Sequence, residues 1–383
     1  PSAVCFLCLP DYFVARRDPR TNRTAMETLQ RALEVAFPAY MLYSGRVHDK
    51  KANAPEPCDK HGVPSNYYGN YGHGPKLTSV QTAKYILLCC LLGITGKGEL
   101  FSFLLILLKG LGIDTLTNVL PGSSFLTSWA FLIVFTLANG VMCAWAYYKQ
   151  CLWFMQEFYQ KQAEKYKQWK CQPDKWLSDD VHWLEIRLGT INAGCAAVYG
   201  MTTTILHLKY GCTALYFDVS DYGLWWYLLS WPVFFTWVEL FAYVNHRFFH
   251  LPFIYRHLHK LHHRFQPPTA FSAVAFHPIE FAVYVFGGQA ILFFVPIHFS
   301  VMLVIGVYTG YSLIEDHSGV ALTPAWPWAP TSKFHDDHHR YFHVNFGQHT
   351  LAFDWLGGTL RSVNREYTED IFGGQGRERV KAS

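Results

Sequence analysis

Hydrophobic and polar positions are segregated into long blocks along this chain, a pattern that predicts membrane-length helices joined by polar loops. The block Phe125–Tyr147 is uncharged and exceeds the roughly 20 residues that span a bilayer. Further apolar blocks occupy Leu188–Leu208 and Leu224–Tyr243, and the pair Pro278–Pro296 and Phe299–Leu313 predicts a helical hairpin. The pattern therefore favours an all-α, polytopic membrane protein.

The N-terminal part of the chain carries weaker signals. Residues 1–80 are polar, and within them only Ala25–Tyr43 has the period of an amphipathic helix. The apolar segments Tyr85–Ile94 and Leu100–Leu108 are too short to span a bilayer, so we expect re-entrant or interfacial helices. Phe154–Lys170 has the composition of a charged surface helix. This region is therefore expected to extend a more C-terminal functional domain.

Histidine is concentrated in one part of the chain, since 14 of the 19 histidines lie between His246 and His349. An HxxxH pair is followed by two HxxHH clusters, and a further histidine, His317, lies between those two. Residues three and four apart share one face of a helix, so each cluster can direct two or three imidazoles to one point. The predicted metal ligands are His246, His250, His259, His262, His263, His317, His335, His338 and His339.

This number of imidazoles exceeds what one ion can bind, so the spacing predicts two metal ions. Imidazole suits iron, copper, zinc or nickel, and the spacing alone does not choose among them. A single HxxxH pair is more often structural. Three clusters beside apolar blocks favour a metal site, because so many histidines near a bilayer would be costly without a shared partner.

The predicted spans also place the clusters relative to the membrane. Seven Lys or Arg residues lie between Lys149 and Arg187, so the positive-inside rule puts this loop in the cytoplasm, or in the matrix for a mitochondrial membrane. An even number of crossings separates the loop from His246, and His246 from His317. We therefore expect a histidine-rich di-metal cap on one membrane face.

Other polar residues near the clusters are expected to support them. His277 either adds a ligand or starts the helix at Pro278, whereas His257, His298, His343 and His349 fall outside the motif spacing and are expected around the site or in structural positions. Metal-bound histidine usually donates its other N–H to a carboxylate or carbonyl group. The candidate carboxylates are Glu239, Glu280, Glu315, Asp316, Asp336, Asp337 and Asp354.

The set of clusters resembles the fatty acid hydroxylase/sterol desaturase superfamily of membrane di-iron enzymes. The resemblance covers roughly Leu188 to Leu360 and includes His317-Ser-Gly and Asn345-Phe-Gly after the last cluster. The motif region is most similar to the 4-methylsterol oxidase and cholesterol 25-hydroxylase branch. Some members carry a further histidine where this chain has Leu313, and relatives often have Asp in the helix where Glu239 lies, which indicates a local difference in geometry.

The resemblance implies a sterol or related lipid that is hydroxylated or desaturated with dioxygen. It implies two iron ions, for which zinc is a possible substitute, and a substrate tunnel between the aromatic-rich helices Leu224–Tyr243 and Phe281–Tyr308. Electrons from NAD(P)H would come through a separate b-type cytochrome or reductase, because the chain has no dinucleotide fingerprint. The expected location is the endoplasmic reticulum, with the mitochondrial inner membrane as the alternative.

The same observations define the expected domains and the rival functions. We expect an N-terminal extension (1–80), extra membrane segments with a charged helix (81–187), a catalytic domain (188–362) and a polar tail (363–383). The rivals are a fatty-acyl lipid hydroxylase or desaturase and a structural subunit of a larger membrane assembly. A net charge of +4 without a long basic run gives no indication of nucleic-acid binding. The ten cysteines form no disulfide framework.

Overall fold

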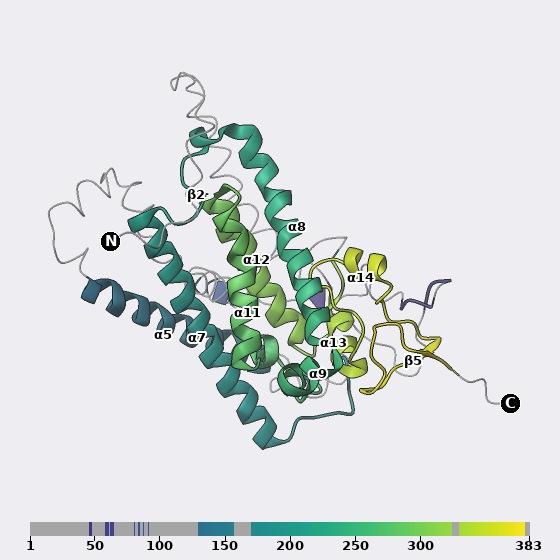
Figure 1. The fold of residues 1–383 in the computed structure, drawn as a ribbon. Helices are drawn as coiled ribbons and strands as arrows, with labels where there is room; N and C mark the ends of the chain where they lie inside the picture. The colour runs from purple at the N-terminus through teal and green to yellow at the C-terminus, as the bar shows by residue number, and fades with distance from the viewer. Residues whose placement is uncertain are drawn as a thin grey trace.

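The computed structural model describes residues 129–156, 170–323 and 329–379, together with short pieces between residues 46 and 91. The described part is mostly helical (Figure 1). Its long helices are α5 (Trp129–Phe154), α7 (Asp179–Tyr210), α8 (Gly223–Phe249), α11 (Pro278–Gln289) with the 3-10 turn η6 (Ala290–Phe293), and α12 (Phe299–His317). Each of the five apolar blocks in the sequence therefore contains a helix, which confirms the helical prediction.

Shorter elements carry the chain between and beyond these helices. Between α8 and α11 lie α9 (Pro252–Ile254), the π-helical turn η4 (Tyr255–His259), α10 (Lys260–His263) and the 3-10 turn η5 (Ala270–Val274). After α12 come α13 (Ser332–Tyr341) and α14 (Ala352–Gly357). The 3-10 turn η3 (Val219–Asp221) precedes α8. The elements η4, α10 and α13 carry histidines that lie near those at the end of α8, whereas η3 lies at its start.

Local sequence explains where the long helices begin and end. Two acidic residues occupy the first turn of α7, where they stabilise the positive end of the helix dipole, and Gly211 ends it with the left-handed φ of 61°. His277 accepts a hydrogen bond from the Ile279 N–H at the start of α11, with Pro278 at the first helical position. His298 caps α12 in the same way. Two histidines outside the motif spacing thus have structural roles.

Three pairs of short strands accompany the helices. β2 (Leu215–Tyr216) and β3 (Ile297–His298) pair in parallel and join the segment before α8 to the segment before α12. β1 (Arg46–Val47) pairs antiparallel with β4 (Leu322–Thr323), and β5 (Arg365–Glu366) pairs antiparallel with β6 (Arg377–Glu378). The β2–β3 pair lies at the end of the bundle opposite the C-terminal elements (Figure 1). It fixes α8 and α12 side by side.

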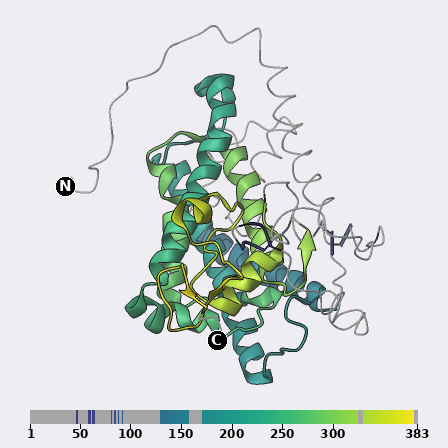
Figure 2. The ribbon, with the colours of Figure 1, turned by 90° about the vertical axis from the view of Figure 1, so that its right-hand side faces the viewer.

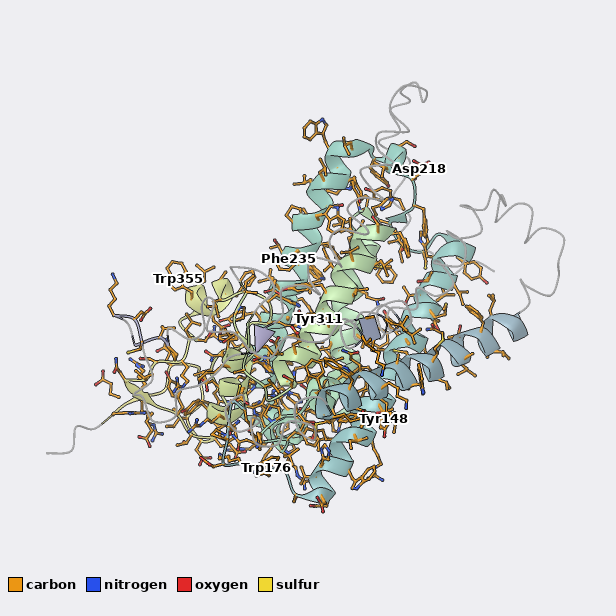
Figure 3. The ribbon with its side chains drawn as sticks, turned by 180° about the vertical axis from the view of Figure 1, so that it is seen from behind. Tyr148, Trp176, Asp218, Phe235, Tyr311 and Trp355 are labelled. Carbon is orange, nitrogen blue, oxygen red and sulfur yellow. The ribbon has the colours of Figure 1, made fainter. Side chains whose placement is uncertain are left out.

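Helices α5 and α7 pack together through small residues. A Cβ atom added to Gly140 would lie 3.1 Å from the Gly194 carbonyl oxygen, so both helices depend on glycine for this close approach. A core of α5, α7, η5 and α12 includes Tyr147, Cys151 and Phe271. A second core joins α8, η6 and α12 around Tyr227 and Ile305. Tyr311 and Phe235 lie in the middle of the molecule, between Asp218 at one end and Trp176 at the other (Figure 3).

Among the residues that the structure describes, α8 is the one helix that is both long and apolar enough to cross a bilayer. Its Leu240, Val244 and Phe248 are 41%, 55% and 48% exposed and lie four residues apart on one face. A polytopic arrangement remains a prediction. The last turns of α8 and α12 nevertheless carry His246 and His317, and these meet the other histidine motifs in two adjacent groups.

Several predicted elements lie outside the described residues. These are the amphipathic helix Ala25–Tyr43, the apolar segment Leu100–Leu108, most of Tyr85–Ile94 and most of the charged helix Phe154–Lys170. Lys170 itself is described. It is 1% exposed and forms an isolated bridge with Val320, so the chain returns to the core at this point.

Candidate metal centre

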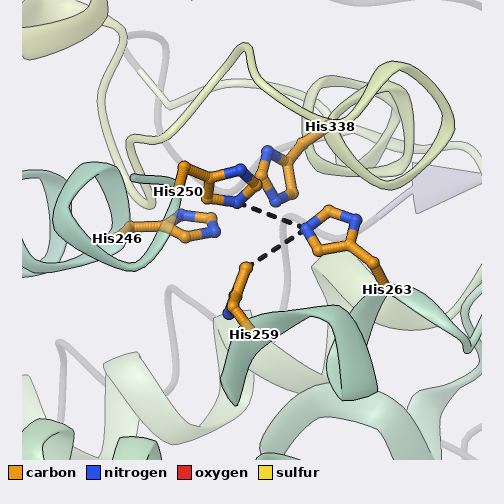
Figure 4. A group of neighbouring side chains, drawn as sticks. All are labelled: His246, His250, His259, His263 and His338. Atoms are coloured by element: carbon orange, nitrogen blue, oxygen red, sulfur yellow. Dashed lines mark hydrogen bonds between the residues drawn. The ribbon is translucent and has the colours of Figure 1, made fainter. Parts of the chain in front are cut away.

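The nine histidines singled out from the sequence lie together in two groups at one end of the bundle. The first group comprises His246, His250, His259, His263 and His338, and the second comprises His262, His317, His335 and His339. Within each group, one ring nitrogen from every member lies within 4.8 Å of those of all the others. Figure 4 shows the first group, whose rings come from separate segments and surround a common point.

Each HxxHH cluster contributes to both groups. In the second cluster His259 and His263 belong to the first group, while His262 belongs to the second; in the third cluster only His338 joins the first group. Residues four apart point in nearly the same direction on a helix, whereas consecutive residues differ by about 100°. Two imidazoles of each HxxHH cluster, rather than all three, therefore share one point. The ring centroids of His338 and His339 lie 5.6 Å apart, so the groups are adjacent.

Distances between ring nitrogens fit the ligands of a shared metal ion. In the first group, His263 Nε2 lies 3.1 Å from His259 Nε2 and 3.3 Å from His250 Nε2. In the second, the corresponding distances from His317 Nε2 to its neighbours are 2.9 and 3.3 Å. Nitrogen ligands about 2.1 Å from one ion lie roughly 3.0 Å apart at right angles and about 3.4 Å apart at tetrahedral angles. Each group can therefore hold one ion.

Several buried ring nitrogens have no hydrogen-bond partner within the part of the chain that the structure describes. Among the nine clustered histidines they are His262 Nδ1, His263 Nδ1, His338 Nε2 and both ring nitrogens of His339. Leaving a buried polar atom unpaired costs about 1–3 kcal/mol. A metal ion bound to His338 Nε2 and to one nitrogen of His339 would remove part of this cost, which supports a metal at both groups.

Burial keeps the imidazoles neutral. Desolvation lowers the pKa of the buried rings well below the usual 6.5, and repulsion from neighbouring rings that could also become charged lowers it further. This applies to His250, His259, His262, His263, His335, His338 and His339. Metals bind the neutral imidazole, so at pH 7 the site presents lone pairs rather than positive charge.

Hydrogen bonds to Nδ1 orient several of these rings. Backbone carbonyl oxygens of Phe346, Val344 and Leu313 lie 2.9, 2.7 and 2.7 Å from the Nδ1 atoms of His246, His338 and His317, respectively. A carbonyl oxygen only accepts, so each Nδ1 must carry the hydrogen and each Nε2 keeps its lone pair. The backbone thus provides the support expected from carboxylates. The carbonyl group that supports His317 belongs to Leu313, the position at which some relatives carry a histidine.

Glu280 is one of the predicted carboxylates, and it contacts a histidine of the first group. It accepts a hydrogen bond from His259 Nδ1, and both side chains are fully buried. Glu239 instead pairs with His349, whose Nδ1 donates to it. At the position where relatives often have Asp, Glu239 therefore pairs with His349, which follows the last HxxHH cluster in the sequence. Asp337 pairs with Lys333, which lies one turn earlier in α13.

Asp354 organises the turn that follows the last cluster. Its carboxylate accepts hydrogen bonds from the backbone N–H groups of Phe346 (2.8 Å) and Gly347 (2.6 Å) and from the Thr359 hydroxyl (2.6 Å). Burial raises the pKa of Asp354 to about 6 despite these bonds. A Cβ on Gly347 would lie 2.7 Å from an Asp354 carboxylate oxygen, which explains the glycine. The turn directs the Phe346 carbonyl toward His246.

His343 connects His250 to the C-terminal segment, a link that the motif spacing does not predict. Its Nδ1 lies 2.8 Å from His250 Nδ1, and its Nε2 lies 2.8 Å from the Glu369 carbonyl oxygen. The Phe372 ring lies against His343 with centroids 4.1 Å apart, and the Glu369 carboxylate pairs with Lys260 at 2.7 Å. The C-terminal segment, yellow in Figure 2, therefore packs against the site.

A largely apolar cavity of about 250 Å³ opens onto the two groups. It is lined by His246 of the first group and by three histidines of the second, and it continues between α5, α7, α8, α11 and α12. Phe276, Tyr284 and Ile305 are among its apolar walls. The tunnel predicted along α8 and the α11–α12 hairpin thus corresponds to a real cavity, with α5 and α7 as further walls.

The remaining histidines lie outside both groups. His277 caps α11, so it has the helix-starting role rather than a place among the clustered rings. His257 is exposed, and its Nδ1 lies 2.7 Å from the Phe253 carbonyl oxygen. His298 Nε2 lies 3.1 Å from the Phe217 carbonyl oxygen, near the β2–β3 pair and far along α12 from His317.

Comparison with known proteins agrees with this geometry. Residues 231–359 match the family model described as fatty acid hydroxylase. A Delta(7)-sterol 5(6)-desaturase of Schizosaccharomyces pombe is 33% identical over 158 residues, which are 41% of this chain and 52% of the relative. Human lathosterol oxidase is 31% identical over 156 residues, 40% of this chain and 52% of the relative. No solved structure matches.

The comparisons cover only part of each relative, and they do not identify the branch of the superfamily. The chain spans about half the length of the curated relatives it matches. Their names differ from those of the 4-methylsterol oxidase and cholesterol 25-hydroxylase branch, which stays a prediction. The predicted superfamily agrees with the comparisons: residues 231–359 match the fatty acid hydroxylase family model, and the similar curated proteins are sterol desaturases and lathosterol oxidases.

Proposed function

We propose that this chain is a membrane-associated oxidoreductase that binds two iron ions and hydroxylates or desaturates a sterol or a related lipid. The observation that carries the proposal is the pair of buried, neutral histidine groups at one end of an apolar cavity. The names of the sterol-modifying relatives support the substrate class. Zinc would also suit imidazole, so iron rests on the family and on the oxidative activity of the relatives.

In this proposal each of the two histidine groups binds one iron ion. The five rings of the first group would hold one ion and the four of the second group the other. When bound, the pair of iron ions supplies the capacity to reduce dioxygen and oxidise an unactivated C–H bond. In His246, His259, His317 and His338, Nδ1 hydrogen bonds to carbonyl oxygens or to Glu280 keep the Nε2 lone pair available. Its apolar walls exclude bulk water and position the lipid.

Electrons would enter from outside the chain. NAD(P)H would supply them through a b-type cytochrome or a reductase, which docks on the membrane face that carries the histidine end of the bundle. The apolar face of α8 supports association with the bilayer. We propose the endoplasmic reticulum as the location, with the mitochondrial inner membrane as the alternative.

Metal analysis of the purified chain tests the metal site. We expect close to two iron ions per chain in protein produced with iron available. His262→Ala removes a ring from the second group and His338→Ala removes one from the first, and each should lose at least one ion and nearly all turnover. His257→Ala, at an exposed histidine outside both groups, is the matched control. Two ions retained by both cluster variants would refute the ligand assignment.

Product analysis separates the sterol reaction from its rivals. Purified protein, a reductase system and a mixture of sterols and fatty-acyl lipids should yield an oxidised sterol. Oxidised acyl chains alone would instead identify a fatty-acyl hydroxylase or desaturase. A chain without iron that produces neither product, and that copurifies with other membrane subunits, would favour the structural role.

A further inference from the structure

The cavity beside the metal centre is long in one direction. On α8 its lining runs from Phe234 to His246, a helical rise of about 18 Å. On α12 the lining runs from Met302 to His317, a rise of about 22 Å. The histidines lie at one end of this space, and the opposite end lies near the start of α12. The cavity therefore fits an elongated ligand.

Gln348 lies where the cavity meets the histidines. Two residues before it, the Phe346 carbonyl oxygen contacts His246 Nδ1, and one residue after it His349 pairs with Glu239. His246 and Glu239 are both on α8, separated by a helical rise of about 10 Å. Gln348 therefore lies beside the last turns of α8, and it lines the cavity there.

The amide of Gln348 has a donor that the protein does not use. Its Nε2 is buried and has no hydrogen-bond partner within the described part of the chain. An unpaired buried donor is unfavourable, so a ligand or a water molecule is expected to accept from it. Gln150 also lines the cavity but has interactions of its own. The hydroxyl of Thr309, another lining residue, already donates to the Ile305 carbonyl oxygen at 2.9 Å.

Asp316 provides a complementary group at the same end. It precedes His317 in α12 and lines the cavity together with Gln348. A carboxylate accepts hydrogen bonds and Gln348 Nε2 donates them, so a hydroxyl group can bind both at the same time. No Lys or Arg is among the described residues that line the cavity, so an anionic ligand would meet Asp316 without a counter-charge. The ligand that fits is an elongated apolar molecule with one neutral hydroxyl group.

We propose that Gln348 and Asp316 bind the hydroxyl group of the substrate at the histidine end of the cavity. The inference rests on the proposed function and specifies the orientation of the substrate. The apolar remainder of the molecule extends between α8, α11 and α12, away from the histidines. The C–H bonds presented to the metal centre therefore belong to the part of the molecule that carries the hydroxyl group.

A bound water molecule is the competing explanation for the unpaired amide. Gln348 and Asp316 also line a second, small pocket of about 20 Å³, to which His349 contributes. A pocket of this size can hold one water molecule. His349 Nε2 is another buried nitrogen without a partner among the described residues, so it is a second donor or acceptor for that water. If this water alone accepts from Gln348, substitution of Gln348 will not change the choice of ligand.

Equilibrium binding to the purified chain tests the assignment with three radiolabelled steroids that differ at one carbon: 5α-cholestan-3β-ol, 5α-cholestan-3-one and 5α-cholestane. We expect the wild type to bind the alcohol about tenfold more tightly than the alkane. The ketone accepts from Gln348 but cannot donate to Asp316, so it should bind more weakly than the alcohol. Gln348→Met keeps the side-chain length without the amide. It should reduce the preference for the alcohol over the alkane to about threefold or less, with alkane binding and iron content unchanged.

Gln289→Met is the matched control at the opposite end of the cavity. Gln289 ends α11 and lines the cavity, and none of its side-chain atoms is buried without a partner. This variant should keep the tenfold preference. The melting temperature of each variant shows whether it is folded.

Photolabelling of the wild-type chain measures the orientation without any substitution. One cholestanol probe carries a diazirine at carbon 6, near the hydroxyl group, and the other carries it at carbon 25, in the side chain. The first should label the segment 331–349 or the end of α12, and the second should label the end of α11 or the start of α12. The opposite pattern would refute the proposed orientation.

The remaining outcomes each overturn a particular statement. An unchanged preference in Gln348→Met would mean that the amide binds only water, and loss of the preference in Gln289→Met would place the hydroxyl group at the far end. Equal binding of ketone and alcohol would remove Asp316 from the site. A wild type that binds all three steroids equally would refute the hydroxyl site and keep the lipid cavity. If it binds none of them, the lipid cavity of the proposed function is wrong, and the role of Gln348 falls with it.

Discussion

His343 is predicted to control the metal affinity of the first group without binding metal itself. The Glu369 carbonyl oxygen only accepts, so His343 Nε2 must carry a hydrogen. Burial lowers the pKa of His343, which keeps the ring neutral and leaves a lone pair on its Nδ1. His250 Nδ1, 2.8 Å away, must then be the donor. The Nε2 of His250 is left with its lone pair, in contact with His263 Nε2 at 3.3 Å.

The perturbation that tests this chain of hydrogen bonds is His343→Leu. It leaves the buried Nδ1–H of His250 without an acceptor, at a cost of about 1–3 kcal/mol. It also lets the His250 hydrogen move to Nε2, where it would block metal binding. Loss of comparable supporting groups weakens metal affinity by about 10–100-fold. We therefore expect a weakening in this range at the first group, and little change at the second.

A conservative variant separates this role from simple packing. In His343→Asn the amide oxygen can accept from His250 while the amide nitrogen donates to the Glu369 carbonyl oxygen, so affinity should return to within a fewfold of wild type. Competition with a chelator of known affinity measures both sites. His257→Leu is the control at an exposed histidine. Wild-type affinity in His343→Leu, or equal losses in the Leu and Asn variants, would show that the tautomer of His250 does not depend on His343.

Three further predictions follow from the site. Gly347→Ala should destabilise the chain by about 1–3 kcal/mol, because the new Cβ meets Asp354 and the Thr350 carbonyl oxygen at 2.7 Å, whereas a Cβ on Gly310 meets nothing within 4 Å. Chemical unfolding of both alanine variants compares them, and equal stabilities would contradict the reasoning. The metal-free protein should be less stable below pH 6.5, because the unfolded chain then binds protons that histidines with lowered pKa do not. Its melting temperature should therefore be lower at pH 5.5 than at pH 8, and an unchanged or higher value would count against buried neutral rings. Glu280→Leu should weaken metal binding at the first group about 10–100-fold, whereas Glu280→Gln, which keeps an acceptor for His259 Nδ1, should lose less, as isothermal titration would show. The reverse order would mean that the carboxylate charge, rather than the hydrogen bond, matters.

Helix positions and the main members of the site could be predicted because both depend on local periodicity. Apolar blocks of sufficient length became α5, α7, α8, α11 and α12, and histidines at helical spacing came together at one end. The division of each HxxHH cluster between the two groups also follows from helix geometry, once a second group exists to receive the middle histidine. Ligation itself stays a prediction until metal is measured.

The supporting contacts could not be predicted, because they join residues far apart in the sequence. Carbonyl oxygens of Phe346 and Val344 support His246 and His338, yet any residue type has a carbonyl group, so the sequence carries no signal for them. Of the carboxylates close to the motifs, Glu280 supports a histidine of the site, while Glu239 contacts His349 through folding at long range.

The contact of Glu369 and Phe372 with His343 affects how shortened versions of the protein should be made. The match to the fatty acid hydroxylase family ends at residue 359, which makes that position an attractive place to truncate an expression clone. A protein cut there would keep all nine clustered histidines yet lack the backbone oxygen that holds His343, the hydrogen-bond partner of His250. The residues that support the metal site therefore extend beyond the end of the family match, to Glu369 and Phe372.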